Sequence, residues 1–123
     1  MLRKMLYLIF PVFLFSACQN EMQENLLGSR VAVSITEEGK ELPVNTEEIT
    51  LNIQSDGTYS YRGTLNYAEA GTWFLEENLL YTQDTTGEGK QKAVLVMRAE
   101  QDTLVLGMTE AGKERILTLQ KRK

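Results

Sequence analysis

The chain has no histidine and only one cysteine, Cys18, among its 123 residues. Without an imidazole, Ser-His and Cys-His nucleophilic catalysis is excluded, and the usual ligand set of a tetrahedral zinc site is missing. A single thiol cannot form an intramolecular disulfide, so the folded part of the chain must be stabilised by a packed core. The composition therefore predicts a protein without a metal or other cofactor.

Motifs for nucleotide and calcium binding are also missing: there is no P-loop, no Gly-x-Gly-x-x-Gly fingerprint and no EF-hand spacing. Residues 84–88 place carboxylates around a glycine, with too few oxygen ligands for calcium, and are interpreted as a turn. Adjacent glutamates occur at residues 37–38, 47–48 and 76–77. Glycoside hydrolysis needs two carboxylates that face one cleft, whereas neighbours on a strand or turn point apart. We therefore expect no enzymatic activity.

Basic residues are in deficit, since 13 Lys and Arg stand against 17 Asp and Glu, a net charge of −4. Arg3 and Lys4 precede Cys18 and all the acidic residues follow it, so the chain after Cys18 carries 11 − 17 = −6. A negatively charged protein gains nothing from counterion release on a phosphate backbone. The basic residues 121–123 at the end of the chain are interpreted as a solvated tail. Nucleic acid is therefore not an expected partner.

Long hydrophobic runs are absent except at residues 5–15, which Pro11 interrupts. This run is well short of the ~20 apolar residues that a membrane-spanning helix needs. Arg3 and Lys4 precede it, and the small residues Ser16 and Ala17 follow it. A positive start, a short apolar stretch and small residues are the layout of a secretory signal peptide.

The end of this segment, Phe15-Ser16-Ala17-Cys18, resembles the lipobox of bacterial lipoproteins, with Phe15 in place of the usual Leu. The resemblance implies that residues 1–17 are a signal peptide, that Cys18 is lipidated, and that the lipid attaches the protein to a membrane. It implies an outer-membrane lipoprotein of the cell envelope, facing the periplasm or the cell surface. The alternative is a cysteine that merely follows an ordinary signal peptide. The polar residues 18–25 are expected to be the lipidated cysteine and a flexible tether, and residues 26–123 the folded domain.

Apolar and polar residues alternate through most of residues 26–123. Ile49, Leu51 and Ile53 are typical, since each is followed by a polar residue. Period-two spacing places the aliphatic side chains on one face of a sheet. Turn signals recur at short intervals, and no stretch of helical length has a 3.6-residue period. The pattern predicts an all-β domain, an antiparallel meander of about eight strands that closes into a small barrel and so removes its exposed edges.

Asp56-Gly57 lies between two alternating runs and predicts a tight hairpin. An Asp-Gly pair suits a two-residue type I′ turn, in which both central residues have positive φ. We therefore expect positive φ at both positions.

Several segments together resemble the lipocalin-like (calycin-type) domains of bacterial lipoproteins. They are Leu27-Gly28, the hairpin around Asp56-Gly57-Thr58-Tyr59, and Gly71-Thr72-Trp73 with the leucines that follow. Many members begin with Gly-x-Trp, whose Trp plugs one end of the barrel, whereas this chain has Gly28-Ser29-Arg30. The plug is thus either missing or supplied by Trp73 alone. The resemblance implies an antiparallel barrel, suggests binding of a small apolar ligand, and supplies no catalytic residues.

The aromatic residues and two strand arginines are the candidate ligand-binding residues. The tyrosines and the tryptophan offer a wide apolar face with one hydrogen-bonding group at the mouth of a cavity. The alternative is that they are ordinary core and cross-strand partners, because eight strands enclose little free space. The arginines are candidates for a ligand carboxylate unless they point outward. The set is Tyr59, Tyr61, Trp73, Tyr81, Arg62 and Arg98.

Two functions from different classes fit this sequence. The first is a lipid-anchored envelope protein that binds a small apolar or amphipathic ligand in, or at the mouth of, a barrel. The second is a protein-interaction module, such as an inhibitor of a secreted hydrolase or an accessory subunit of an envelope complex. The polar loop at residues 84–91 has no apolar or aromatic anchor of the kind that dominates protein interfaces, which favours the first.

Overall fold

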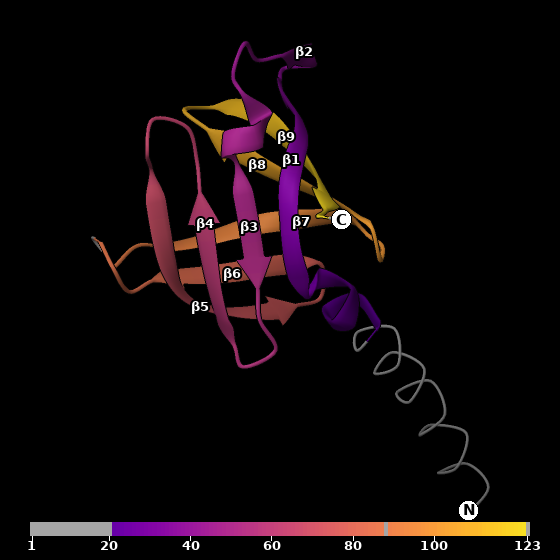
Figure 1. Cartoon of the computed structure of the whole chain (residues 1–123), viewed down its shortest axis with the longest axis vertical. Coiled ribbons are helices and arrows are strands. Elements are labelled where there is room, and N and C mark those ends of the chain that lie inside the picture. Colours follow the sequence, from indigo (N-terminus) through magenta and orange to yellow (C-terminus); the bar gives the residue numbers. More distant parts are fainter. Residues whose placement is uncertain (1–20, 88, 123) are drawn as a thin grey trace, which may run out of the picture.

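The computed structural model describes residues 21–87 and 89–122, and the predicted signal peptide and Cys18 lie outside these ranges. Within them, the chain is almost entirely β-structure (Figure 1). No helix in the described ranges is both long and apolar enough to cross a bilayer.

Eight strands form a closed antiparallel barrel, which confirms the predicted fold class. The strands β1 and β3 to β9 pair in chain order, and β1 also pairs with β9 to complete the ring. A short β2 extends only the far end of β1, and a 3-10 turn, η1, precedes β3. The bounds are β1 (Gly28–Glu37), β2 (Lys40–Glu41), η1 (Thr46–Glu48), β3 (Thr50–Ile53), β4 (Thr58–Arg62), β5 (Ala68–Glu76), β6 (Leu79–Asp84), β7 (Gln91–Ala99), β8 (Thr103–Glu110) and β9 (Lys113–Lys121).

The core lies inside the barrel and consists of the inward-facing residue of each alternating pair. Leu51 and Ile53 of β3 are buried, whereas Thr50 and Asn52, which alternate with them, are only partly covered. The same alternation buries Leu104 and Leu106 of β8 and Leu117 and Leu119 of β9. The period of two in the sequence therefore corresponds to the inner and outer faces of the wall.

The β3–β4 hairpin differs from the expected type I′ turn. Of Asp56 and Gly57, only Gly57 has a positive φ, at 89°. Its N–H donates to the carbonyl of Gln54 at 3.2 Å, and the Asp56 carboxylate accepts from the N–H and the hydroxyl of Thr58. The loop is thus longer than two residues, and the Asp56 side chain stabilises it in place of a second residue with positive φ.

Gly71 of β5 is required by a close approach of backbone. A Cβ at this position would lie 1.8 Å from the carbonyl oxygen of Gln83 on β6. Just beyond that contact, the N–H of Thr85 donates to Ala70 O at 2.9 Å. The glycine of the Gly71-Thr72-Trp73 segment therefore lets the backbone of β6 approach that of β5 closely. This close approach accounts for the glycine in that part of the sequence motif.

A short helical turn at residues 21–26 packs against one end of the barrel (Figure 1). Leu26 is completely buried, Met22 packs against the core, and the Asn25 side-chain amide donates to Ala99 O at 3.1 Å. Residues 21–25 were expected to belong to a flexible tether. Their apolar contacts and this hydrogen bond instead attach them to the barrel.

Arg30 closes the same end of the barrel. It lies in β1 at the position where the resembling family has the tryptophan plug, and it is only 1% exposed. Its guanidinium donates to the carbonyl oxygens of Leu26 at 2.8 Å, Asn25 at 2.5 Å and Glu100 at 3.1 Å. Burial lowers the pKa of Arg30, and the charge of Asp102 partly opposes that shift. An arginine held by backbone carbonyls therefore occupies the plug position.

Candidate functional site

A cavity of about 640 Å³ opens at the end of the barrel opposite Arg30. Its rim includes Gly63 and Thr64, which follow β4, and Thr109 and Glu110 at the end of β8. A volume of this size matches the sites that hold small organic molecules. The barrel is therefore filled by side chains at one end and hollow at the other.

One part of the cavity wall is formed by large aliphatic side chains. These side chains come from strands β3, β6, β7, β8 and β9 around the barrel, and several of them also belong to the buried core. They offer an apolar ligand surface that water wets poorly. The set is Leu51, Leu80, Val94, Leu106, Met108 and Leu117.

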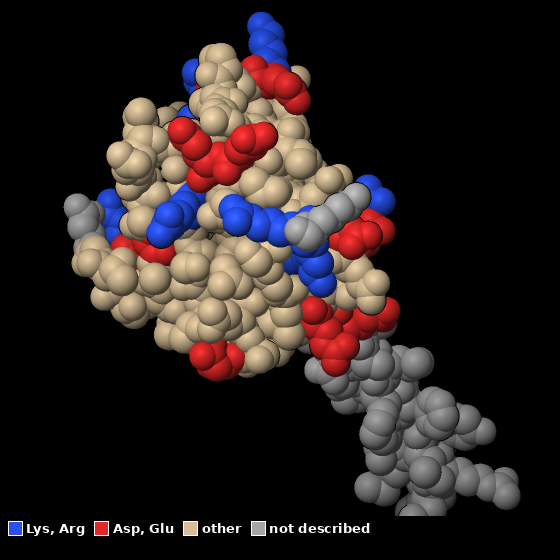
Figure 2. All heavy atoms as spheres, in the orientation of Figure 1, with Lys and Arg blue, Asp and Glu red and all other residues tan. Residues whose placement is uncertain are grey.

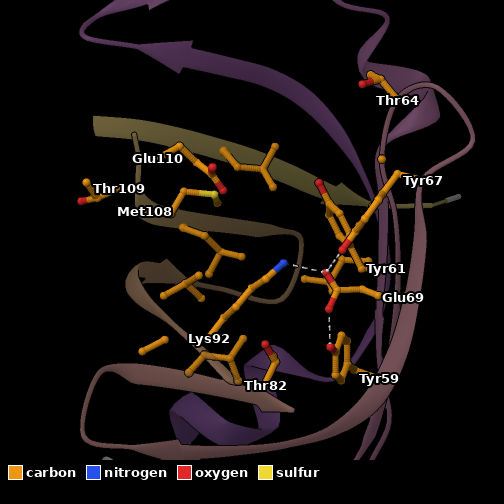
Figure 3. A pocket seen from close by; sticks show the side chains of 17 residues that line it. Tyr59, Tyr61, Thr64, Tyr67, Glu69, Thr82, Lys92, Met108, Thr109 and Glu110 are labelled. Carbon is orange, nitrogen blue, oxygen red and sulfur yellow. Dashed lines mark hydrogen bonds and ion pairs between the residues drawn. The ribbon is translucent and has the colours of Figure 1, made fainter. Parts of the chain in front are cut away.

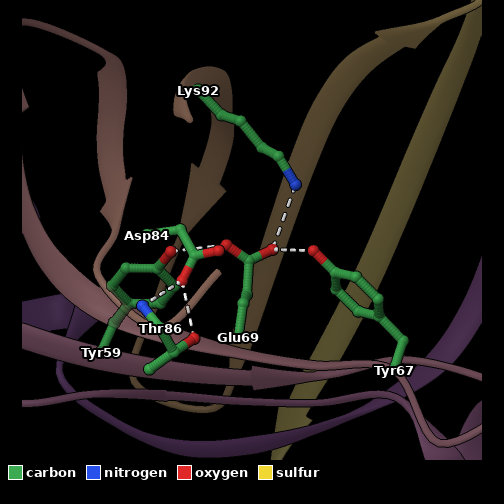
Figure 4. Close-up of polar contacts among 6 residues, drawn as sticks. All are labelled: Tyr59, Tyr67, Glu69, Asp84, Thr86 and Lys92. Atoms are coloured by element: carbon green, nitrogen blue, oxygen red, sulfur yellow. Dashed lines mark hydrogen bonds and ion pairs between the residues drawn. The ribbon is translucent and has the colours of Figure 1, made fainter. Parts of the chain in front are cut away.

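The polar part of the wall is centred on the carboxylate of Glu69, which is 8% exposed. Oε2 accepts from the Tyr59 hydroxyl at 2.6 Å, and Oε1 accepts from the Tyr67 hydroxyl at 3.1 Å. Lys92 Nζ also reaches Oε1, at 3.1 Å. Figure 4 shows these three donors converging on one carboxylate from different directions. A buried charge is stable only when paired and hydrogen-bonded in this way.

Strand alternation brings these groups together. Glu69 lies on β5 in phase with Gly71 and Trp73, so its side chain points into the barrel. Lys92 lies on β7 in phase with Val94 and Val96 and reaches inward from the rim (Figure 3). The Lys92 side chain remains 46% exposed, against 6% for Glu69.

Burial and the neighbouring carboxylate control the protonation of this cluster. Burial, reinforced by the hydrogen bond to Glu69, raises the pKa of Tyr59. Burial also raises the pKa of Tyr61 and Tyr67, and the charge of Glu69 adds to both shifts. For Lys92, burial alone would lower the pKa, but the hydrogen bond and charge of Glu69 outweigh it and the pKa rises. The phenols therefore stay neutral donors and the lysine stays a cation.

Two of the predicted ligand-binding residues, Tyr59 and Tyr61, line this cavity. They are neighbours in phase on β4. Tyr61 also meets Tyr67 edge to face, with ring centroids 6.1 Å apart. Trp73 is buried but is not part of the cavity lining, and its indole N–H donates to Gln54 O at 2.9 Å. Trp73 is therefore a core residue near the β3–β4 turn.

The other three predicted residues lie on the outside of the barrel and do not line the cavity. Tyr81 stacks on Phe74 with ring centroids 4.8 Å apart, because it lies one position out of phase with the inward-facing Leu80. Arg62 borders a shallow outer hollow together with Glu47 and Glu48. Arg98 is exposed and pairs with Glu100. On the face shown in Figure 2, basic and acidic side chains lie interspersed.

Glu69 and Lys92, which form the ion pair of the cavity, are not among the residues predicted from the sequence. In each case the local signal is a charged residue on the same face of its strand as a buried residue. Glu69 shares a face of β5 with Trp73, and Lys92 shares a face of β7 with Val96. That signal shows that each side chain points inward. It does not show that the two meet, because their contact depends on the register of three strands.

Among the residues that the structure describes, no group of three or more Cys, Asp or Glu side chains is placed to hold a metal ion. The polar groups of the cavity instead form one hydrogen-bonded cluster on one side of an apolar wall. Such an arrangement orients an amphipathic molecule by its polar end.

Comparison with known proteins supports the fold. No protein-family profile matches the sequence, and no curated protein matches it. The barrel is similar to the crystal structure of a lipocalin-like protein from Bacteroides uniformis, with a TM-score of 0.62 and 15% identity over 80% of this chain and 99% of that one. It is also similar to an uncharacterized protein from Bacteroides eggerthii, with a TM-score of 0.57 and 12% identity over 78% of this chain and 98% of that one. The fold is therefore a lipocalin-like barrel.

Proposed function

We propose that this protein binds a small amphipathic molecule in the open end of its barrel. The observation that carries the proposal is the cavity of about 640 Å³, in which an aliphatic wall faces the Glu69 cluster. An apolar body gains from leaving water against this wall, by roughly 25 cal/mol for each Å² buried. A polar end can replace or join the hydrogen bonds of the cluster.

We also propose that the protein acts as a lipoprotein of the cell envelope, held to an outer membrane by a lipid on Cys18. The support is the signal-like segment at residues 1–17 and the lipobox-like Phe15-Ser16-Ala17-Cys18. An anchored binding protein would keep its ligand at the envelope.

Ligand binding is tested by titrating a neutral, environment-sensitive apolar dye into the whole protein in detergent-free buffer, at dye concentrations from below to above that of the protein. One dye should bind per chain, because a barrel of this size holds one small ligand. Trp73 is not part of the cavity lining, so the dye rather than the tryptophan should report binding.

Tyr61→Ala and Tyr81→Ala form a matched pair for this test, since Tyr61 lines the cavity and Tyr81 lies outside. Tyr61→Ala should weaken dye binding about tenfold, the equivalent of ~1.4 kcal/mol, and Tyr81→Ala should leave it unchanged. Equal effects of the two substitutions, or no saturable binding at all, would contradict the proposal. Native mass spectrometry of protein purified from its own host would identify a retained ligand.

A second function is supported by a different surface. On the outer face of β5 and β7, Phe74, Leu95 and Met97 are between 40% and 51% exposed. These strands lie on either side of β6, and exposed apolar side chains on one face of a sheet favour a protein contact. We propose an interaction-module role on this face if the cavity binds nothing. Phe74→Ser should then abolish co-purification of a partner from the native host while leaving the melting temperature unchanged.

A further inference from the structure

We propose that the ligand is an organic cation, an amphipathic amine whose ammonium group takes the place of Lys92 Nζ beside Glu69. This inference rests on the proposed binding function and names the ligand class for the same cavity. The hydrocarbon part of the amine would lie against the aliphatic wall, and its nitrogen would sit among the tyrosines.

The first support is that the cavity is built around a carboxylate that remains held when Lys92 leaves. Tyr59 donates to one oxygen of Glu69 and Tyr67 to the other, at 2.6 and 3.1 Å. The Tyr59 hydroxyl bonds Oε2, the oxygen that Lys92 does not contact, whereas the Tyr67 hydroxyl shares Oε1 with Lys92 and also interacts with the ammonium group. Departure of Lys92 would therefore leave a buried anion, still oriented, with one cation position open at Oε1.

The second support is that Lys92 is placed to leave. Its side chain is 46% exposed and that of Glu69 only 6%. A long flexible stem lets the ammonium group move from the cavity to water at the rim, where it is well hydrated. Figure 3 shows the side chain extended across the cavity toward Glu69. Lys92 thus occupies the cation position as an internal, displaceable substitute for a ligand.

The third support is the sign of the charge. Of the described residues that line the cavity, Glu69 and Glu110 are acidic and only Lys92 is basic, so the lining carries a charge of 1 − 2 = −1. An anion placed beside Lys92 would lie close to Glu69, which already binds that ammonium group at 3.1 Å. Like charges at such a distance repel strongly where water is largely excluded. The cavity therefore disfavours fatty acids and other carboxylates.

The fourth support is the arrangement of aromatic rings. Tyr61 and Tyr67 lie at 64° to each other, and Lys92 Nζ is 5.8 Å from the centre of the Tyr67 ring. Ring faces attract cations at this range, and groups of rings are the usual recognition element for substituted ammonium groups. An alkylammonium ion in the position of Nζ would make the same contact while placing its hydrocarbon chain against the aliphatic wall.

The test measures how four ligands of equal chain length displace the neutral dye: octylamine, octyltrimethylammonium, octanoate and octanol. The amine should displace the dye at a concentration at least about tenfold lower than octanoate or octanol. Octyltrimethylammonium should displace the dye at a concentration similar to that of octylamine if contacts with the tyrosine rings dominate binding. Displacement by octanoate at the lowest concentration would overturn the inference and make Lys92 the anchor of an anion.

Two variants separate the roles of the two charges. Lys92→Met removes the internal cation and should strengthen amine binding about tenfold, without strengthening octanol binding. Glu69→Gln should remove the preference of the amine over octanol. If Glu69→Gln fails to fold, Lys92→Met alone decides, because the inference requires a gain in amine affinity and an anion site requires a loss of octanoate affinity.

The outcomes distinguish this inference from the proposed function. Dye binding with equal displacement by all four ligands would overturn the cation inference and leave the binding function standing. No saturable dye binding to the unmodified protein would overturn both.

Discussion

Arg30 shows how much a single buried residue contributes to this fold. Its guanidinium joins the helical turn at residues 21–26 to the β7–β8 turn by donating to carbonyls on both. Among the described residues, its Nε finds no hydrogen-bond partner. The arginine therefore carries some desolvation cost, which its other hydrogen bonds must exceed.

Arg30→Met should destabilise the domain by about 2–4 kcal/mol, because one buried carbonyl and several partly buried ones would lose their charged donor. Arg98→Met is the matched control: Arg98 is exposed, and its ion pair with Glu100 should contribute less than about 1 kcal/mol. Urea unfolding followed by Trp73 fluorescence measures both. Similar midpoints for the two variants would show that Arg30 does not hold this end together.

The raised pKa values of Tyr59, Tyr61 and Tyr67 make stability fall in alkaline solution. In the unfolded chain these phenols ionise near pH 10, whereas in the folded chain they ionise at higher pH. Their contribution is therefore complete below about pH 10 and is lost as the pH rises through the folded pKa values. Ultraviolet absorbance of tyrosinate should appear at higher pH in native than in denatured protein. Tyr61→Phe should remove one late-titrating phenol, and coincident titration curves would refute the expectation.

At the scale of elements, the β3–β4 hairpin depends on Gly57 rather than on an Asp-Gly pair. Gly57 has a φ of 89°, and a Cβ there would meet no atom within 4 Å, so a substitution is penalised by backbone strain alone. Gly57→Ala should therefore cost about 1 kcal/mol. Gly63→Ala, where a Cβ would make only ordinary contacts of 3.5 Å, should cost less. Thermal unfolding of the two variants checks this, and equal melting temperatures would contradict it.

The strands could be predicted from the sequence because each is encoded locally. The alternation of Ile49, Leu51 and Ile53 is enough to place β3 and its inner face. The exact turn was less predictable, because Asp56 accepts hydrogen bonds through its side chain where a positive φ was expected. Local patterns therefore determine strand positions better than loop conformations.

The candidate site was only partly predictable, because it is assembled from distant parts of the chain. Tyr59 and Tyr61 could be placed on one face from β4 alone. The contact of Lys92 with Glu69 joins positions 23 residues apart, and the bond from Arg30 to Glu100 O spans 70 residues. Such contacts depend on barrel closure and strand register. The only local indication of these contacts in the sequence is a charged residue on the same face of a strand as buried residues.

For the molecule as a whole, the proposed anchor is the first property to test. Cys18→Ser should prevent lipid attachment and move the protein from the membrane fraction to soluble or uncleaved forms. Metabolic labelling with a fatty acid, followed by fractionation, measures this directly. A Ser variant that still incorporates label would refute lipidation at this residue. Ser16→Ala keeps a small residue before the cysteine and serves as the control that should still be labelled.

The two ends of the barrel have consequences for where a ligand can enter. The described chain begins at the end that Arg30 closes, and the cavity opens at the opposite end. With a lipid on Cys18, the mouth would face away from the bilayer. Loading and release would then take place with the surrounding aqueous compartment or with a protein docked on the distal rim, and not by direct extraction from the membrane that holds the anchor.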